Sequence, residues 1–436
     1  MSQNTKGLSL FALTMIAIGS TIGSGIFKTP TDIAKAVPDS TEMILLWVAG
    51  GLISLIGALV FAELGSRYSG GGGLYTYLNK TIGPMPAFLY GWSLFTVVSS
   101  GTIAALIIVF ADYTQKFIPF ADEYKPLVAA ISVVILTLFN TFGIKSSEWF
   151  ANISTVLKII GIYGILLAAL FLGTRDIFDT AGAVVVDAAA NGGPNYAKAF
   201  VGVLWSYTGW HYASFVAGDA SNPKRNIPLA MIIGTTVVTL TYVLCNMGYM
   251  KVLDTTTIQN SSTLASDAMG KIIPGSEKAV AALIAISVFG CAGLYILATP
   301  RIIRQMSVEG IFFKTFAKDH PRFGVPLNAI ILQSVISIVL IFIWKGFENL
   351  YTYVTITEWF FLLLTCVGIF VARSRDKENV AGFKTPLYPI LPIIFILVVG
   401  WFIYMNALSD DPSAYFGLLI IPVGALFYFI YKKISR

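Results

Sequence analysis

Long apolar runs dominate the chain and are separated by short polar segments. Each of the twelve runs has the roughly 20 residues that a helix needs to cross the hydrocarbon core of a bilayer. They lie at about 8–37, 42–66, 84–112, 124–144, 148–173, 196–218, 229–250, 278–303, 326–344, 350–372, 386–407 and 413–431. The pattern predicts an all-α integral membrane protein with 12 transmembrane helices.

The first and sixth runs are interrupted by small and polar residues. Three glycines lie within the segment 19–25 of the first run, and Gly209 ends the sequence Trp-Ser-Tyr-Thr-Gly in the sixth. A helix that gives up hydrogen bonds inside hydrocarbon must be buried or line a cavity. Small residues also let helices pack closely, which is the alternative explanation for one such break.

Two breaks at matching positions favour a binding site, because paired interruptions mark the substrate site of transporters built from inverted repeats. The placement predicts two five-helix repeats, at 1–173 and 174–373, each opening with a broken helix. Residues 374–436 then hold two additional helices and the C-terminus.

Composition supports a membrane protein with little room for a soluble domain. The chain has 436 residues, is 56% hydrophobic and is only 12% charged, whereas soluble domains are about a quarter charged. Its mean hydropathy is +0.77. The three cysteines, Cys245, Cys291 and Cys366, lie within predicted spans, so no disulfide framework, metal site or cofactor is predicted.

The net charge of +6 is explained by topology. With the N-terminus inside the cell, most of the 29 lysines and arginines fall in cytoplasmic loops, as the positive-inside rule requires. We therefore expect a multi-pass protein of the cell membrane with both termini cytoplasmic. Membrane lipid is a partner, and nucleic acid is not.

Three titratable residues within or beside the spans are candidates for function. Lys158 lies about ten residues into the fifth span, where a lysine costs about 2.5–3.5 kcal/mol; snorkelling to an interface is the alternative. Glu358 either takes a proton during coupling or lies in the outer vestibule. His211, beside the second break, is either a proton carrier or a packed, hydrogen-bonded histidine.

Four passages resemble the amino acid–polyamine–organocation superfamily, and its L-type amino acid transporter family in particular. They are the segment 19–27, the sequence Ala-Glu-Leu-Gly-Ser-Arg-Tyr at 62–68, the segment 205–210 with Asn-Pro-Lys-Arg-Asn-Ile-Pro at 222–228, and Ala-Thr-Pro-Arg at 298–301 continuing to Pro326. The resemblance implies a LeuT-type fold that holds an amino acid between unwound helices 1 and 6. It also implies sodium-independent exchange.

The resemblance assigns roles to particular residues. Trp205 corresponds to an aromatic gate over the substrate, with a packing aromatic as the alternative. Thr208 occupies a position that varies with substrate charge, and a threonine there suits neutral substrates. Lys158 matches a helix 5 lysine whose ammonium replaces a sodium ion. Animal members join a glycoprotein through a cysteine between helices 3 and 4; this chain has none at 112–125, so no disulfide-linked heavy chain is expected.

A zwitterionic amino acid requires donors for its carboxylate and acceptors for its ammonium. Free N–H groups at Ser24, Gly25 and Ile26, with the helix dipole behind them, suit the carboxylate. Carbonyl groups freed at the two breaks suit the ammonium. The predicted substrate-binding residues are Ser20, Thr21, Ile22, Gly23, Ser24, Gly25, Ile26, Trp205, Ser206 and Thr208.

The sequence thus predicts a secondary transporter that exchanges small to medium neutral L-amino acids, such as alanine, serine and threonine, without sodium. Proton-coupled symport is the alternative, and a channel or a transport-dead sensor is more remote. An enzyme is not expected, because the chain has only 2 histidines and no acid cluster within its spans.

Overall fold

The computed structural model describes residues 7–68, 72–141, 144–178, 184–188, 192–344, 346–375 and 382–434, apart from the side chains of 144–155, 431 and 434. Among the described residues, all regular secondary structure is helical. One isolated β-bridge joins Leu8 and Ala220. The prediction of an all-α protein is therefore confirmed.

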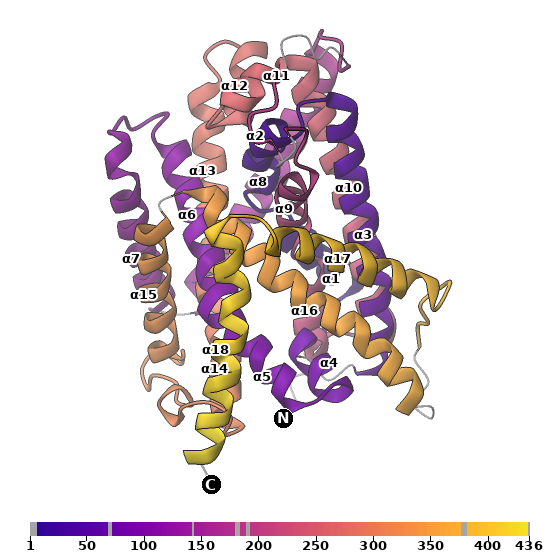
Figure 1. Cartoon of the computed structure of the whole chain (residues 1–436). Coiled ribbons are helices and arrows are strands. Elements are labelled where there is room, and N and C mark those ends of the chain that lie inside the picture. The colour runs from indigo at the N-terminus through magenta and orange to yellow at the C-terminus, as the bar shows by residue number, and fades with distance from the viewer. Residues whose placement is uncertain are drawn as a thin grey trace.

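The elements follow the apolar runs (Figure 1). In order they are α1 (Leu10–Thr21), α2 (Gly25–Ala36), α3 (Ser40–Arg67), α4 (Gly73–Thr81), α5 (Pro84–Ser93), the π-helix η1 (Leu94–Ser99), α6 (Ser100–Thr114), η2 (Asp122–Tyr124), α7 (Lys125–Thr141), α8 (Ile144–Leu172), α9 (Tyr196–Tyr207), η3 (Trp210–Asp219), α10 (Pro223–Val252), α11 (Thr255–Asn260), α12 (Leu264–Ile272), α13 (Glu277–Ala298), α14 (Pro300–Val308), η4 (Lys314–Phe316), α15 (Leu327–Trp344), α16 (Phe347–Arg375), α17 (Ile390–Ala407) and α18 (Pro412–Ile434).

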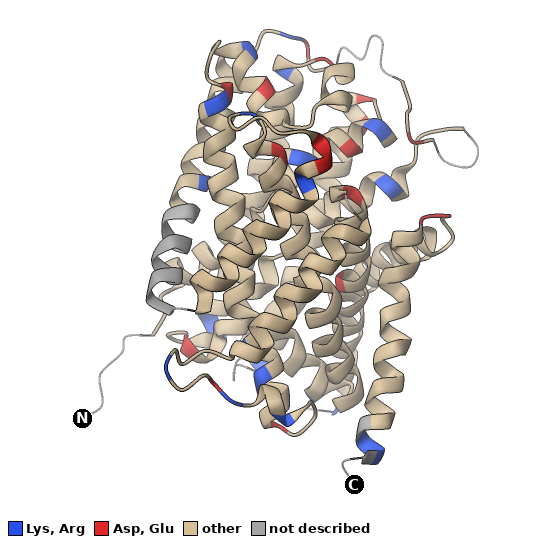
Figure 2. Ribbon diagram, turned by 90° about the vertical axis from the view of Figure 1, so that its left-hand side faces the viewer, with Lys and Arg blue, Asp and Glu red and all other residues tan. Residues whose placement is uncertain are grey.

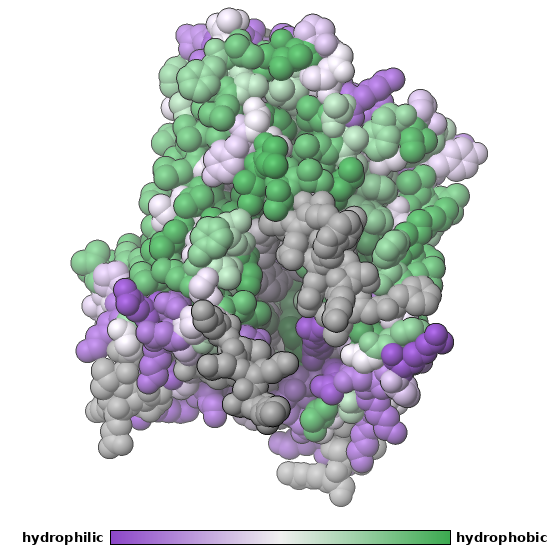
Figure 3. All heavy atoms as spheres, turned by 180° about the vertical axis from the view of Figure 1, so that it is seen from behind, coloured by the Kyte–Doolittle hydropathy of each residue, from purple (hydrophilic) through white to green (hydrophobic). Residues whose placement is uncertain are grey.

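Among the described residues, 9 spans are long and apolar enough to cross a membrane, and 10 if α1 and α2 count as one bent span. Charged residues gather toward the two ends of the molecule, with few between them (Figure 2). A broad hydrophobic belt covers much of the outer surface (Figure 3). The protein is a multi-pass membrane protein.

The most central span runs from Pro84 to Thr114 through α5, η1 and α6, and 89% of its apolar window is buried. At the periphery, only 28% of the α17 window and 22% of the α18 window are buried. Side chains such as Leu397 and Leu419 are more than half exposed, which suits a lipid-facing surface. The two interrupted spans lie inside this shell: α1 packs on α10 and η3, and α2 packs on α9.

Three short helices occur where the sequence predicts only connecting loops. α4 follows the glycine-rich segment, where Gly72 and Gly73 adopt positive φ angles of 83° and 51°. α11 and α12 lie at the upper end of the molecule, above the ends of the long helices (Figure 1). Asp254 caps α11 by accepting a hydrogen bond from the N–H of Thr257. Such local caps form helices too short for a hydropathy pattern to detect.

Gly209 is predicted to be essential for packing the sixth span against the first. Its φ angle is +130°, and a Cβ atom there would lie 2.5 Å from the carbonyl oxygen of Ser20. We expect Gly209→Ala to lower the melting temperature of the purified protein, at a cost of about 1–3 kcal/mol. The matched control is Gly164→Ala, since Gly164 is exposed on α8 and a Cβ atom there meets nothing within 4 Å. Equal melting temperatures for the two variants would contradict this packing.

Candidate functional site

The first break is a three-residue interruption between α1 and α2. α1 ends at Thr21 and α2 begins at Gly25, and their axes bend by 41°. Ser24 precedes α2 without making a side-chain cap. Its carbonyl oxygen accepts a hydrogen bond from the N–H of Phe27 at 3.1 Å, whereas the N–H groups of Gly25 and Ile26 come too early in α2 to have an acceptor within that helix. Free donors at a helix N-terminus form a favourable place for an anion.

The second break lies between α9 and η3. α9 ends at Tyr207, and the chain resumes at Trp210 as a 3-10 helix rather than an α-helix. The interruption itself is limited to Thr208 and Gly209 and is therefore narrower than the predicted segment 205–210. The 3-10 form leaves a different set of carbonyl groups exposed than a continuous α-helix would.

The two breaks are in direct contact. The hydroxyl group of Ser20 donates a hydrogen bond to the carbonyl oxygen of Gly209 at 3.0 Å. The hydroxyl groups of Thr29 and Ser206 are hydrogen-bonded at 2.8 Å. A Cβ atom at Gly25 would overlap the side chain of Ser206. Residues about 180 positions apart thus form one site, as the paired breaks in the sequence suggest.

A small cavity of about 30 Å³ lies between the breaks. This volume accommodates about two water molecules. Its walls are formed by Ser20, Thr21, Gly23, Ser24, Gly25, Thr102, Leu106, Trp205, Thr208, Cys291, Tyr295 and Glu358. Seven of the ten predicted substrate-binding residues are in this list. The other three, Ile22, Ile26 and Ser206, are buried beside it.

Several groups at the cavity already have partners within the protein. The carbonyl oxygen of Thr21 accepts a hydrogen bond from the Tyr242 hydroxyl group at 3.0 Å. The Thr208 hydroxyl group accepts one from the indole N–H of Trp359, also at 3.0 Å. The hydroxyl group of Ser24, in contrast, is buried without a hydrogen-bond partner among the described residues. Ser24 is therefore the wall residue best placed to donate to a bound molecule.

Lys158 connects the fifth span to the first break. Its side chain is 1% exposed, and its ammonium group donates a hydrogen bond to the carbonyl oxygen of Gly19 at 3.0 Å. The ammonium group also lies 2.8 Å from the sulfur atom of Cys291, which lines the cavity. Lys158 is thus too deep to reach an interface and contacts both the last turn of α1 and the wall of the cavity.

Glu358 and His211 form a buried pair that the sequence does not reveal. His211 Nε2 lies 3.1 Å from Glu358 Oε1, and the side chains are 0% and 2% exposed. Glu358 lines the cavity, whereas His211 lies behind it. The sequence treats these residues as separate candidates, because no local pattern shows that the middle of α16 meets the start of η3.

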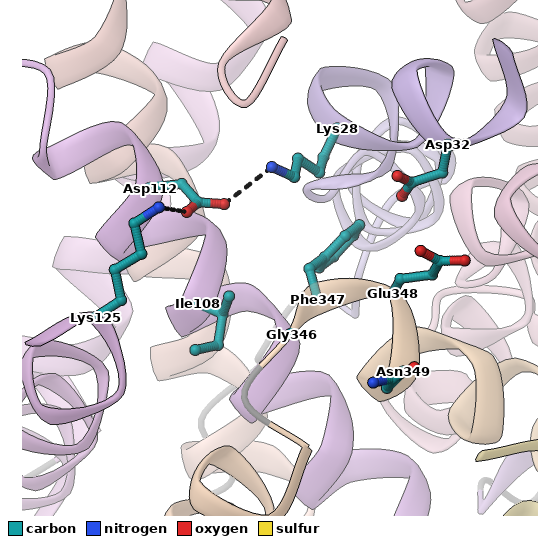
Figure 4. Close-up of a pocket in the computed structure, with 9 residues that line it drawn as sticks. All are labelled: Lys28, Asp32, Ile108, Asp112, Lys125, Gly346, Phe347, Glu348 and Asn349. Atoms are coloured by element: carbon teal, nitrogen blue, oxygen red, sulfur yellow. Dashed lines mark hydrogen bonds and ion pairs between the residues drawn. The ribbon is translucent and has the colours of Figure 1, made fainter. Parts of the chain in front are cut away.

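A larger cavity of about 350 Å³ is lined by residues of α2, α6 and the start of α16 (Figure 4). Asp112 on α6 binds Lys28 at 3.0 Å and Lys125 at 3.1 Å. Asp32 and Glu348 lie on another side of the same cavity (Figure 4). These acids are also ion-paired, Asp32 with Lys35 at 3.6 Å and Glu348 with Lys198 at 2.8 Å. We call this larger cavity the vestibule.

An aromatic layer separates the vestibule from the inner cavity. Phe347 lines the vestibule, and Trp205 lines the inner cavity. Their rings pack edge to face with centroids 6.1 Å apart, and Tyr351 contacts both rings. Trp205 thus occupies the place that a gate on this side of the cavity would take.

Glu63 ties helices together at the opposite end. It is fully buried and pairs with Arg67 at 3.0 Å and with Arg373 of α16 at 2.6 Å. The N–H group of Thr385 donates a further hydrogen bond to it at 2.8 Å. This cluster joins α3, α16 and the segment before α17. Within the described residues, no group of three or more histidine, cysteine, aspartate or glutamate side chains is arranged to hold a metal ion.

Comparison with known proteins gives concordant matches over the whole chain. The model of the amino acid permease family matches residues 8–427. The chain is 29% identical to human b(0,+)-type amino acid transporter 1, over 98% of this chain and 88% of that protein. It is 28% identical to the serine/threonine exchanger SteT of Bacillus subtilis, over 97% and 96%, and 25% identical to the human cystine/glutamate transporter, over 98% and 86%. The chain belongs to the amino acid permease family, which confirms the resemblance to the amino acid–polyamine–organocation superfamily seen in its motifs.

Proposed function

We propose that this protein exchanges neutral L-amino acids across the cell membrane, without sodium, by alternating access. The observation that carries the proposal is the contact of two broken helices around one buried cavity. Family membership supports amino acid transport. The names of its relatives include a serine/threonine exchanger and a cystine/glutamate transporter, and they are transporters rather than enzymes.

The site offers complementary groups for the two charges of an amino acid. The carboxylate binds at the N-terminus of α2, to free N–H groups and to the unpartnered Ser24 hydroxyl group. The ammonium binds to carbonyl groups at the breaks. The Thr21 carbonyl oxygen, which already accepts from Tyr242, retains a second lone pair for this purpose.

The closed cavity requires motion at the breaks before a substrate enters. Its volume of about 30 Å³ holds about two water molecules and is too small for an amino acid. Broken helices permit such motion, because their halves move without stretching a continuous hydrogen-bond ladder. The layer of Trp205, Phe347 and Tyr351 opens on the vestibule side.

Lys158 accounts for sodium independence in this proposal. Its ammonium group is bonded to the Gly19 carbonyl oxygen at the end of α1, where it supplies a fixed positive charge in place of a removable cation. Because it also contacts the cavity wall at Cys291, its position depends on the geometry of both α1 and α13. Lys158 is therefore placed to link substrate occupancy to the position of α1.

The complete architecture that we propose is a LeuT-type fold with 12 spans. The bent pair α1–α2, α8 and the pair α9–η3 supply the spans that length and hydropathy alone leave out. Residues 1–173 and 174–373 form the inverted repeats, followed by α17 and α18. The end that carries Glu63 and both termini faces the cytoplasm, and the vestibule faces outward. No disulfide-linked heavy chain is needed, since the segment between α6 and α7 has no cysteine.

Exchange is tested by uptake of labelled L-serine into proteoliposomes at matched pH without sodium. We expect uptake to require unlabelled L-serine or L-alanine inside, because the carrier returns loaded. Accumulation in empty vesicles under an imposed pH gradient would contradict exchange and establish proton symport, which the buried His211–Glu358 pair makes the second candidate.

Lys158→Met is expected to reduce the exchange rate by about tenfold or more. The variant removes a charged hydrogen bond of ~1.5–3 kcal/mol between α8 and α1 while it keeps a side chain of similar length. Lys271→Met, at an exposed position of α12, serves as the control and should exchange at the wild-type rate. Wild-type exchange by Lys158→Met would remove the lysine from the mechanism.

Ser24→Ala is expected to weaken L-serine affinity without lowering the melting temperature. The Ser24 hydroxyl group has no partner among the described residues, so the fold loses no hydrogen bond. The substrate carboxylate loses one, which corresponds to about tenfold in KM. Ser206→Ala is the contrasting variant, since its hydroxyl group donates to the Gly202 carbonyl oxygen, and it should lower the melting temperature. An unchanged KM for Ser24→Ala would place the carboxylate elsewhere.

A further inference from the structure

An acidic side chain lines the cavity that we assign to neutral amino acids. Glu358 lies in the middle of α16, is 2% exposed, and shares the cavity wall with Ser20, Thr208 and Tyr295. A carboxylate at this position would attract a substrate with a cationic side chain. Thr208 by itself suggests a neutral cavity wall, but the wall also contains Glu358. A preference for neutral substrates therefore requires a group that compensates the charge of Glu358.

His211 is the counterpart of this acid. Its Nε2 atom lies 3.1 Å from Glu358 Oε1, and its ring is held by stacking on Tyr212 at 4.6 Å and by an edge contact with Trp210 at 5.4 Å. His211 follows the second break by two residues, so the element that forms the cavity also positions the histidine. It is absent from the cavity wall itself.

The other titratable groups around Glu358 are phenols, which are neutral at physiological pH. Three tyrosines interact electrostatically with the Glu358 carboxylate: Tyr90 of α5, Tyr212 of η3 and Tyr295 of α13. Lys158 of α8 reaches the same cavity through Cys291, but its ammonium group is bonded to the Gly19 carbonyl oxygen. Among the described side chains, His211 is the ion-pair partner found for Glu358.

Burial favours a pair without net charge. A lone carboxylate or imidazolium in a site this dry carries a large desolvation penalty. An imidazolium and a carboxylate 3.1 Å apart have opposite charges, and their sum is zero. The pair therefore presents a polar but uncharged surface to the cavity.

We propose that the His211–Glu358 pair is the charge filter of the substrate site, in which His211 neutralises Glu358 and thereby excludes cationic side chains. This inference rests on the proposed function. Without His211, the Glu358 carboxylate is unpaired in the wall and selects a substrate whose side chain ends in an ammonium group.

The test compares L-lysine with L-norleucine, which has the same chain length but lacks the terminal ammonium group. Apparent affinities are measured from ligand-induced shifts in the melting temperature of the purified full-length protein. For wild type, we expect norleucine to be preferred. For His211→Gln, the lysine-to-norleucine affinity ratio should rise about tenfold, the size of one hydrogen bond to a charged group.

Two further variants separate the filter from a general structural effect. Glu358→Gln and the double variant His211→Gln/Glu358→Gln both lack the carboxylate, so neither should gain affinity for lysine. If His211→Gln does not fold, His211→Asn is the replacement, with the same expected gain.

The filter is overturned if removal of His211 leaves the ratio unchanged, or if the gain persists in the double variant. Because the measurement reports binding, it remains informative if the protein proves to be a symporter rather than an exchanger. A wild-type protein that is stabilised by neither ligand nor by L-serine would instead overturn the proposed substrate class, and the filter with it.

Discussion

Backbone groups that leave a helix inside a membrane must find partners within the protein, and this requirement governs the centre of the molecule. The two breaks meet it together. Ser20 donates across to Gly209, Tyr242 donates to the Thr21 carbonyl oxygen, and Lys158 donates to the Gly19 carbonyl oxygen. The groups that stay unpaired, at Ser24 and the start of α2, face the cavity. The same interruption thus accounts for the packing of the two breaks and for the binding that we propose there.

The rest of the fold encloses this centre. Apolar helices such as α17 and α18 face lipid, while the central span from α5 to α6 is buried. On the vestibule side, Trp205 and Phe347 close the path beneath the ion pairs of Asp112. At the other end, Glu63 binds α3 to α16 through Arg373. One helix, α16, contributes to all three places. It carries Phe347 of the aromatic layer, Glu358 of the cavity wall and Arg373 of the Glu63 cluster.

Hydropathy and glycine placement predicted both breaks and, of the 12 spans expected, the nine or ten that the described residues support, because these features depend on local composition. Most predicted site residues, from Ser20 to Thr208, line the cavity for the same reason. The sequence did not predict η3 as a 3-10 helix, nor that α4, α11 and α12 are helical, since these elements depend on tertiary packing and short caps. It also could not pair Glu358 with His211 or Glu63 with Arg373, because only the fold brings those residues together.

The account depends on the cavity between the breaks being the place where substrate binds, and Cys291 provides a native probe of it. Cys291 lines the cavity, whereas Cys245 and Cys366 are buried elsewhere and serve as internal references. The measurement is the rate at which N-ethylmaleimide modifies each cysteine, followed by peptide mass spectrometry with and without saturating L-serine. We predict that L-serine slows modification of Cys291 selectively. An unchanged Cys291 rate in protein that transports L-serine would show that the substrate binds elsewhere.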